Sequence, residues 1–291
     1  MKFFFNRHRR ATWNFPSERG LFVIGAARSG TTILQDALNH SRDICLLGEP
    51  DLHTESEEGG FAARFNAMHH SWNNQQTKGT YLPVLGDSDG SWRAHLEDLS
   101  KVYRLVGTKV VASPGQGDAW MERLRAFHNR YFFTSRYIFT FRAPTAVLKS
   151  TMLMRGLASG DITSLAQNYA AVIVLFTQMA RTMPNVRAVV HEDIDASTFE
   201  KLGEWLGVSL EGAHAYYQSE KVVSHTADGF EGEAFDKRLE LLNSLYQNLR
   251  RLVADGAERP QIQQNGVKLY AGQKAEIYGL LDSQAGYLAK N

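Results

Sequence analysis

The sequence has little cysteine, no long apolar run and almost no net charge. Its 291 residues include one cysteine, Cys45, which excludes an internal disulfide and therefore a disulfide-stapled secreted scaffold. No segment approaches the roughly 18 uninterrupted apolar residues that a membrane-spanning helix requires. The 32 Lys and Arg residues nearly balance the 31 Asp and Glu residues, for a net charge of +1. This balance disfavours the overall basic surface of a nucleic-acid-binding protein, although a local basic cleft is compatible with it.

The beginning of the chain lacks the order of features that marks a secretory signal peptide. In such a peptide the charges precede an apolar stretch of about 7–15 residues, whereas here the run Phe3 to Phe5 precedes the first arginine, Arg7. This order favours a cytoplasmic protein with no transmembrane segment. The basic, aromatic start is compatible with contact to a membrane surface, but a frayed terminus is the favoured interpretation.

Apolar residues are plentiful, at 43%, which is enough for a sizeable core. Short apolar runs alternate with longer helical patterns, and this alternation predicts an α/β fold with three layers, α/β/α, around a mainly parallel sheet. One domain is expected over residues 1–291. Strands are predicted at 21–24, 44–47, 105–111, 137–141 and 186–190, and helices from the turn after the first strand to about 40 and at 161–183, 199–206 and 233–253.

Residues 55–100 interrupt this alternation. Glycine-rich breakers such as Gly59-Gly60 and the segment 86–90 predict an irregular insertion over the sheet edge, a usual place for an acceptor pocket or lid. The core is then formed by residues of about 20–54 and 101–210. Residues 211–291 are expected to form a helical C-terminal part, of which the last 35 or so residues have too weak a periodicity for assignment.

The most informative segment is 21–34, in which a hydrophobic strand enters a turn of small residues that opens a helix. This arrangement directs backbone N–H groups and the positive end of a helix dipole at one point, and so predicts an anion site. Gly25 and Gly30 supply backbone freedom there. An ordinary strand–helix turn with a helix cap is the alternative. The residues predicted to hold the anion are Arg28, Ser29, Gly30, Thr31 and Thr32.

The same loop lacks the lysine of a nucleotide-hydrolysing P-loop. Its Gly-x4-Gly spacing matches the first part of that motif, but Thr31 stands where the lysine should follow. An NTPase would lose the cation that reaches the β- and γ-phosphates. Arg28 instead supplies a guanidinium, which binds tetrahedral oxyanions with two hydrogen bonds. The loop therefore suits a phosphate-like anion but not standard ATP hydrolysis.

A second motif follows the strand predicted at 137–141. Arg142 ends this strand, Pro144 suits the first turn of a helix, and Ser150 lies about two turns further on. Ligands of open α/β sheets gather at the carboxyl ends of the strands, so Arg28 and Arg142 should meet at one edge. Two cations at this edge predict a ligand with two separated anionic groups.

Together these two motifs resemble the sulfotransferase superfamily that uses 3′-phosphoadenosine-5′-phosphosulfate. The resemblance implies a P-loop NTPase-like sulfotransferase fold, with the first loop on the 5′-phosphosulfate and Arg142 and Ser150 on the 3′-phosphate. Residues 189–194 and 202–207 are similar to a strand and a helix of the family, so the match spans about 20–210 without 55–100. Arg28 stands where the cytosolic branch has lysine, which points to the bacterial and carbohydrate-modifying branches. The glycine-rich basic segment near the end of cytosolic members is absent.

The residues expected to carry out the chemistry are Glu49, Lys109 and Arg28. Glu49 follows the strand at 44–47, and the carbohydrate-modifying branches have a matching Glu that is interpreted as the general base; a solvated loop acid is the alternative. His53 is the competing base, since its ordinary pKa lies closer to neutrality. Lys109 lies in an apolar strand and resembles an active-site lysine of the family, or else is an edge-strand lysine that prevents aggregation.

We therefore expect a sulfotransferase that moves sulfonate from 3′-phosphoadenosine-5′-phosphosulfate to a hydroxyl or amine of a small-molecule or saccharide acceptor. No metal is required in this interpretation, because Arg28 and Lys109 would neutralise the transferring group and the leaving phosphate. Two alternatives are a P-loop kinase-like phosphotransferase and a non-catalytic nucleotide-binding protein. The acceptor and the oligomeric state are not readable from the sequence.

Overall fold

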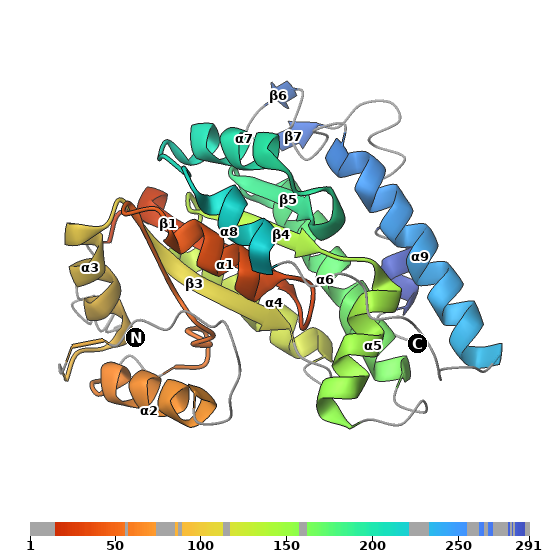
Figure 1. Ribbon diagram of the computed structural model, residues 1–291, viewed down its shortest axis with the longest axis horizontal. Helices are drawn as coiled ribbons and strands as arrows, with labels where there is room; N and C mark the ends of the chain where they lie inside the picture. The colour runs from red at the N-terminus through yellow and green to blue at the C-terminus, as the bar shows by residue number, and fades with distance from the viewer. Residues whose placement is uncertain are drawn as a thin grey trace, which may run out of the picture.

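A computed structural model describes most of the chain (Figure 1). The residues that it describes are 15–55, 58–73, 85–86, 89–112, 117–156, 162–220, 233–254, 262–264, 267–269, 279, 281 and 283–288.

Five parallel strands form the central sheet, in the order β2-β3-β1-β4-β5. The chain starts in the middle of the sheet, builds one side of it and then returns past β1 to build the other. The carboxyl ends of β1 and its neighbours therefore surround the point at which the strand order reverses, where ligands of open α/β sheets bind. The strands are β1 (Gly20–Ala26), β2 (Ile44–Leu47), β3 (Leu105–Ala112), β4 (Arg136–Phe141) and β5 (Val186–Val190).

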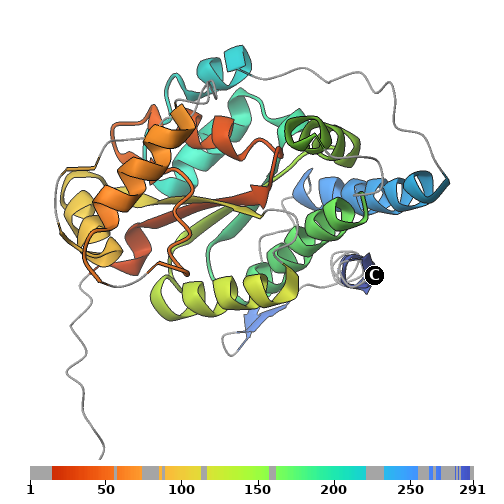
Figure 2. The same cartoon turned by 90° about the horizontal axis from the view of Figure 1, so that it is seen from below.

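Both faces of the sheet are covered by helices, which accounts for strands that are apolar along nearly their whole length. One apolar cluster joins a sheet face to residues of α4, α5, α6 and α9, and a second joins the other face to α1, α7 and α8. Figure 2 shows these layers on either side of the sheet. This architecture confirms the predicted α/β fold with a central parallel sheet. The helices are α1 (Thr31–Asn39), α2 (Phe61–Asn73), α3 (Trp92–Val102), α4 (Gly117–Tyr131), α5 (Pro144–Arg155), α6 (Ile162–Thr182), α7 (Ala196–Leu206), α8 (Ala213–Glu220) and α9 (Glu233–Ala254).

The expectation of an irregular segment at 55–100 is wrong, since α2 and α3 lie within it. Phe61 and Phe65 of α2 stack on each other one helical turn apart, and Trp92 and Leu96 of α3 are buried at the same spacing. Ser91 caps α3 with its side chain. The glycine-rich breakers flank these helices instead of interrupting them. The high glycine content therefore led to the wrong prediction of irregular structure.

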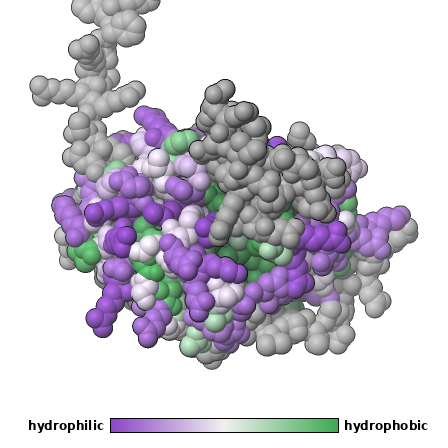
Figure 3. All heavy atoms as spheres, turned by 90° about the horizontal axis from the view of Figure 1, so that it is seen from above, coloured by the Kyte–Doolittle hydropathy of each residue, from purple (hydrophilic) through white to green (hydrophobic). Residues whose placement is uncertain are grey.

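The C-terminal part contains α8 and α9, and α9 matches the helix predicted at 233–253. It also contains a short antiparallel pair, β6 (Ile262–Gln264) and β7 (Val267–Leu269), in the segment that the periodicity left unassigned. None of the helices in the described part of the chain is both long enough and apolar enough to cross a membrane. On the face seen in Figure 3, the described surface is mostly hydrophilic, with smaller apolar areas between the polar ones.

Candidate functional site

The loop between β1 and α1 has a left-handed backbone conformation at two residues, Arg28 and Gly30. Gly30, at the start of α1, has φ of 93°, and a Cβ atom there would lie 2.8 Å from Nδ1 of His191. Glycine is therefore required at this position for both its conformation and the space. Arg28 also adopts a positive φ, 68°, which is uncommon for a residue with a side chain. Strain of this kind at a loop that opens a helix is typical of ligand sites.

Ser29 and Thr31 hold the loop in place. The Ser29 hydroxyl donates to the backbone oxygen of Ala26 at 2.7 Å, and Thr140 of β4 donates to the oxygen of Ser29 at 3.0 Å. Thr31, the first residue of α1, is buried as well. The structure thus places the Ser29 side chain inside the loop rather than at an open surface, and its part in donor binding stays a prediction.

Arg28 and Ser150 are brought together although 122 positions separate them. Nε of Arg28 donates to Oγ of Ser150 on α5 at 2.8 Å. Burial lowers the pKa of Arg28, and repulsion from the positive charge of Arg142 lowers it further. Arg142 itself is buried, at 7% exposure, and its backbone oxygen accepts a hydrogen bond from the Tyr169 hydroxyl at 2.7 Å.

Two guanidinium groups therefore repel each other in a largely buried place. No carboxylate of the described residues forms an ion pair with Arg28. A partly desolvated cation beside a second cation is unfavourable until an anion enters between them. The arrangement of Arg28, Arg142 and Ser150 is thus suited to an oxyanion held by forked hydrogen bonds.

Lys109 joins the loop to the candidate base. Its Nζ donates to Oγ1 of Thr32 at 2.7 Å and lies 2.9 Å from Oε1 of Glu49, while its side chain is only 1% exposed. Glu49 remains 28% exposed and so faces solvent beside the loop. The edge-strand interpretation of Lys109 is wrong, because β3 lies between β2 and β1 in the sheet.

Within the described part of the chain, His53 packs elsewhere, against α4, and makes no hydrogen bond or ion pair with Lys109 or Glu49. Its ring meets Trp120 and Phe127 of α4 edge to face, at centroid distances of 5.4 and 6.3 Å, and its Nε2 is buried without a hydrogen bond. Burial lowers the pKa of His53 to about 4, with repulsion from Arg123 adding to the shift. Of the two candidate bases, Glu49 is the one that contacts the phosphate loop, through Lys109.

An unexpected acid, Asp51, lies beside Glu49. Burial raises the pKa of Asp51 to about 6, and repulsion from Glu49 and Glu55 raises it further. Negative charge therefore accumulates at the β2 end of the site, whereas positive charge accumulates at the end formed by β1 and β4. Nothing in the sequence pattern had marked Asp51, because one acid in a loop is ordinary.

His191 and Tyr217 are further neighbours of the loop that the residue patterns did not single out as site residues. His191 follows β5 and packs against Gly30, and its Nδ1 is 2.5 Å from the hydroxyl of Tyr217 on α8. Both side chains are buried. The segment 189–194 had been noted only as similar to a family strand, and nothing in the sequence pointed to Tyr217. Among the described residues, no group of three or more His, Cys, Asp and Glu side chains is arranged to hold a metal ion.

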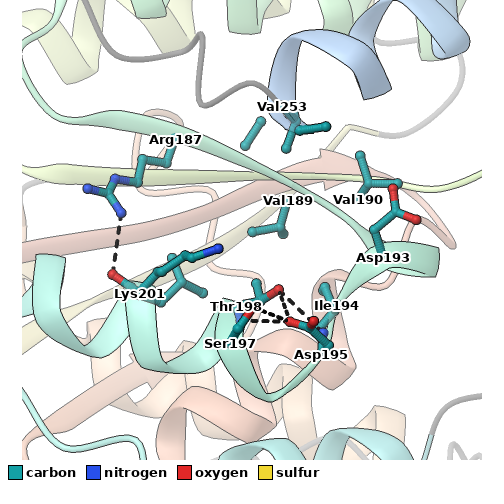
Figure 4. Close-up of a pocket in the computed structure, with 13 residues that line it drawn as sticks. Arg187, Val189, Val190, Asp193, Ile194, Asp195, Ser197, Thr198, Lys201 and Val253 are labelled. Atoms are coloured by element: carbon teal, nitrogen blue, oxygen red, sulfur yellow. Dashed lines mark hydrogen bonds between the residues drawn. The ribbon is translucent and has the colours of Figure 1, made fainter.

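A cavity of about 510 Å³ lies elsewhere, along the outer edge of β5 (Figure 4). Its two carboxylates have partners within the protein: Asp193 pairs with Arg250, and Asp195 accepts hydrogen bonds from Ser197 and Thr198 at the start of α7. This cavity is thus distinct from the loop site. It also lacks the excess of charge of one sign that the loop site has.

No family model matches the chain, and no curated protein matches it either. Among solved structures, the chain is similar to the sulfotransferase domain from the Synechococcus PCC 7002 olefin synthase. The two are 17% identical, the alignment covers 91% of this chain and 94% of that domain, and the TM-score is 0.48. A likeness at this level assigns neither an activity nor a ligand to this chain.

Proposed function

We propose that this protein is a sulfotransferase that uses 3′-phosphoadenosine-5′-phosphosulfate as donor and the hydroxyl or amine of a small molecule or saccharide as acceptor. The observation that carries the proposal is the meeting of Arg28, Ser150 and Arg142 without a carboxylate partner for Arg28 among the described residues. A donor with phosphate groups at two places can bind both guanidinium groups. The resemblance of the two motifs to the donor-binding motifs of the superfamily supports the same ligand.

Glu49, at the β2 end of the site, and Lys109 beside it suit an in-line transfer of the sulfonate group. The acceptor oxygen or nitrogen attacks the sulfur, the bond from sulfur to the bridging phosphate oxygen breaks, and adenosine 3′,5′-bisphosphate leaves with the electron pair. Glu49 takes the proton from the acceptor, as a general base must. Lys109 contacts both Glu49 and Thr32. In the proposed reaction it neutralises charge on the sulfonate and the leaving phosphate.

The kinase-like alternative is disfavoured by Thr31 at the position of the P-loop lysine and by Arg28 in the loop. A non-catalytic nucleotide-binding protein would need the same donor cluster but not the contact between Lys109 and Glu49. That contact of 2.9 Å, beside the loop that we assign to the donor, favours an enzyme.

The replacement Glu49→Gln separates these functions. We expect turnover to fall by about 10²- to 10⁴-fold, the range for loss of a general base, because the amide cannot take a proton. Donor affinity should change by less than about threefold, since Gln can still accept a hydrogen bond from Lys109. Turnover is measured with isotope-labelled donor and a metabolite extract, with sulfonated products detected by mass spectrometry. Unchanged turnover in Glu49→Gln would remove Glu49 from the chemistry, and absence of any labelled product with the wild type would favour the non-catalytic function.

A further inference from the structure

The turn that follows β5 contacts two parts of the protein. On one side it meets the backbone next to Arg142, and on the other side it meets α9. Glu192 lies in this turn, and its Oε1 accepts a hydrogen bond of 2.9 Å from the backbone N–H of Ala143. Its second carboxylate oxygen, Oε2, accepts a hydrogen bond of 2.6 Å from the hydroxyl of Tyr246. Ala143 directly follows Arg142, and Tyr246 is a buried residue of α9. One carboxylate therefore connects the backbone next to Arg142 to the C-terminal helix.

These contacts hold both polar atoms of a single peptide group. The carbonyl of the Arg142–Ala143 peptide accepts from Tyr169, and its N–H donates to Glu192. A peptide plane that is fixed at both ends cannot rotate without breaking a hydrogen bond. The direction in which the Arg142 side chain leaves the backbone depends on that plane.

A second pair of residues strengthens the link to α9. Arg250 donates through Nε to Oδ2 of Asp193 at 2.6 Å, and its Nη2 also binds Oδ1 of Asp193. This pair is solvent-exposed and is therefore weaker than its geometry suggests. The helix itself packs against α5 and β5 (Figure 1), so its position is fixed relative to the second motif and to the turn after β5.

We propose that Glu192, held by Tyr246, is a positioning residue for Arg142 and that α9 is thereby part of the donor clamp. The inference rests on the proposed function, in which Arg142 binds the 3′-phosphate of the donor. A guanidinium whose backbone is fixed beforehand loses less entropy when it binds, which is the general benefit of preorganisation. Losing the link should therefore weaken recognition of the 3′-phosphate and leave the 5′ end, bound by the β1–α1 loop, unaffected.

The test compares two nucleotides by isothermal titration calorimetry: adenosine 3′,5′-bisphosphate and adenosine 5′-monophosphate, which lacks the 3′-phosphate. In Glu192→Ala and Tyr246→Phe, we expect the affinity ratio between the two to fall by about three- to tenfold, the effect of one hydrogen bond. Affinity for the monophosphate should change by less than about twofold, which also shows that the variant is folded. Glu192→Gln should restore the ratio, because its amide oxygen can accept from Ala143 and its amide nitrogen can donate to Tyr246.

The matched controls are Arg250→Ala and Arg251→Ala, neighbouring arginines of which only Arg250 binds the turn. A small fall in the ratio is expected for the first and none for the second. If the wild type does not prefer the bisphosphate, the proposed function fails and the inference fails with it. If the wild type prefers it and Glu192→Ala and Tyr246→Phe keep the full ratio, the inference alone is overturned. An equal loss for both nucleotides also overturns it, because that is the mark of general loosening.

Discussion

At the carboxyl edge of the sheet, the end formed by β1 and β4 brings Arg28 and Arg142 together, while the β2 end brings Glu49 and Asp51 together. Arg28 has its pKa lowered by burial and by its cationic neighbour, and Asp51 has its pKa raised by burial and by its anionic neighbours. Each end thus gathers groups of one charge: positive at the end formed by β1 and β4, and negative at the β2 end. Lys109 and Glu49 form the ion pair between them.

This polarity matches what transfer of a sulfonate group requires. In the proposed reaction, the anionic donor binds at the cationic end and the acceptor loses its proton at the acidic end. At the β5-edge cavity, by contrast, Asp193 pairs with Arg250, and Asp195 accepts hydrogen bonds from the start of α7. The like charges gathered at its two ends therefore distinguish the proposed site from this cavity.

The largest effect on donor binding is expected from breaking the cationic end with Arg28→Ala. Affinity for adenosine 3′,5′-bisphosphate should fall by about 10- to 100-fold, corresponding to about 1.5–3 kcal/mol for hydrogen bonds to a charged group. The ligand-free variant should be no less stable in thermal unfolding than the wild type, because repulsion with Arg142 is removed. Arg187→Ala is the control, since Arg187 lines the β5-edge cavity and stacks on Trp205 at 4.5 Å. Equal donor affinities of Arg28→Ala and wild type would refute the assignment of the cationic end.

A smaller effect tests whether His53 belongs to the acidic end. The pKa of His53 in the folded protein is about 4, below its ordinary value of 6.5, so the unfolded chain binds more protons between these values. Wild-type stability should fall as the pH drops from 6.5 towards 4, and His53→Gln should lose part of this dependence. We expect turnover of His53→Gln at neutral pH to stay within about twofold of wild type. A collapse of turnover comparable to that of Glu49→Gln would instead make His53 the base.

The smallest effect concerns Asp51. Its folded-state pKa of about 6 lies above the ordinary 3.8, so the folded protein binds more protons in this window and stability falls as the pH rises. Asp51→Asn should therefore raise the unfolding temperature at pH 8, and the gain should disappear below about pH 4. Chemical or thermal unfolding at both pH values measures this. A variant that is less stable than the wild type at pH 8 would contradict the proposed repulsion at this end.

The strands could be predicted because their apolar patterns are local in the sequence. The runs at 44–47 and 186–190 are short, apolar except for Arg187 and bounded by polar turns, and they match β2 and β5 residue for residue. Helices α2 and α3 were missed because the glycines around them outweighed the spacing of Phe61 and Phe65. Composition also could not reveal that β3 is an inner strand, since strand order depends on how the chain crosses over.

Most residues of the candidate site that could be predicted follow a strand directly, whereas Lys109 lies within a strand and Ser150 within a helix. Arg28, Glu49 and Arg142 stand at strand ends, and the rule that ligands gather there placed them at one edge. Tyr217 and Tyr246 come from later helices and reach this edge through packing, which no local pattern encodes. Asp51 became notable only through its burial and its charged neighbours.

The central claim is that Arg28 and Arg142 together bind one adenine nucleotide with two separated anionic groups. It is tested most directly by calorimetry of the wild type and Arg142→Ala with adenosine 3′,5′-bisphosphate, adenosine 5′-monophosphate and ATP with magnesium. The account predicts that the bisphosphate binds tightest to the wild type and that Arg142→Ala removes its advantage over the monophosphate. Binding of ATP with magnesium that equals or exceeds that of the bisphosphate would contradict the account.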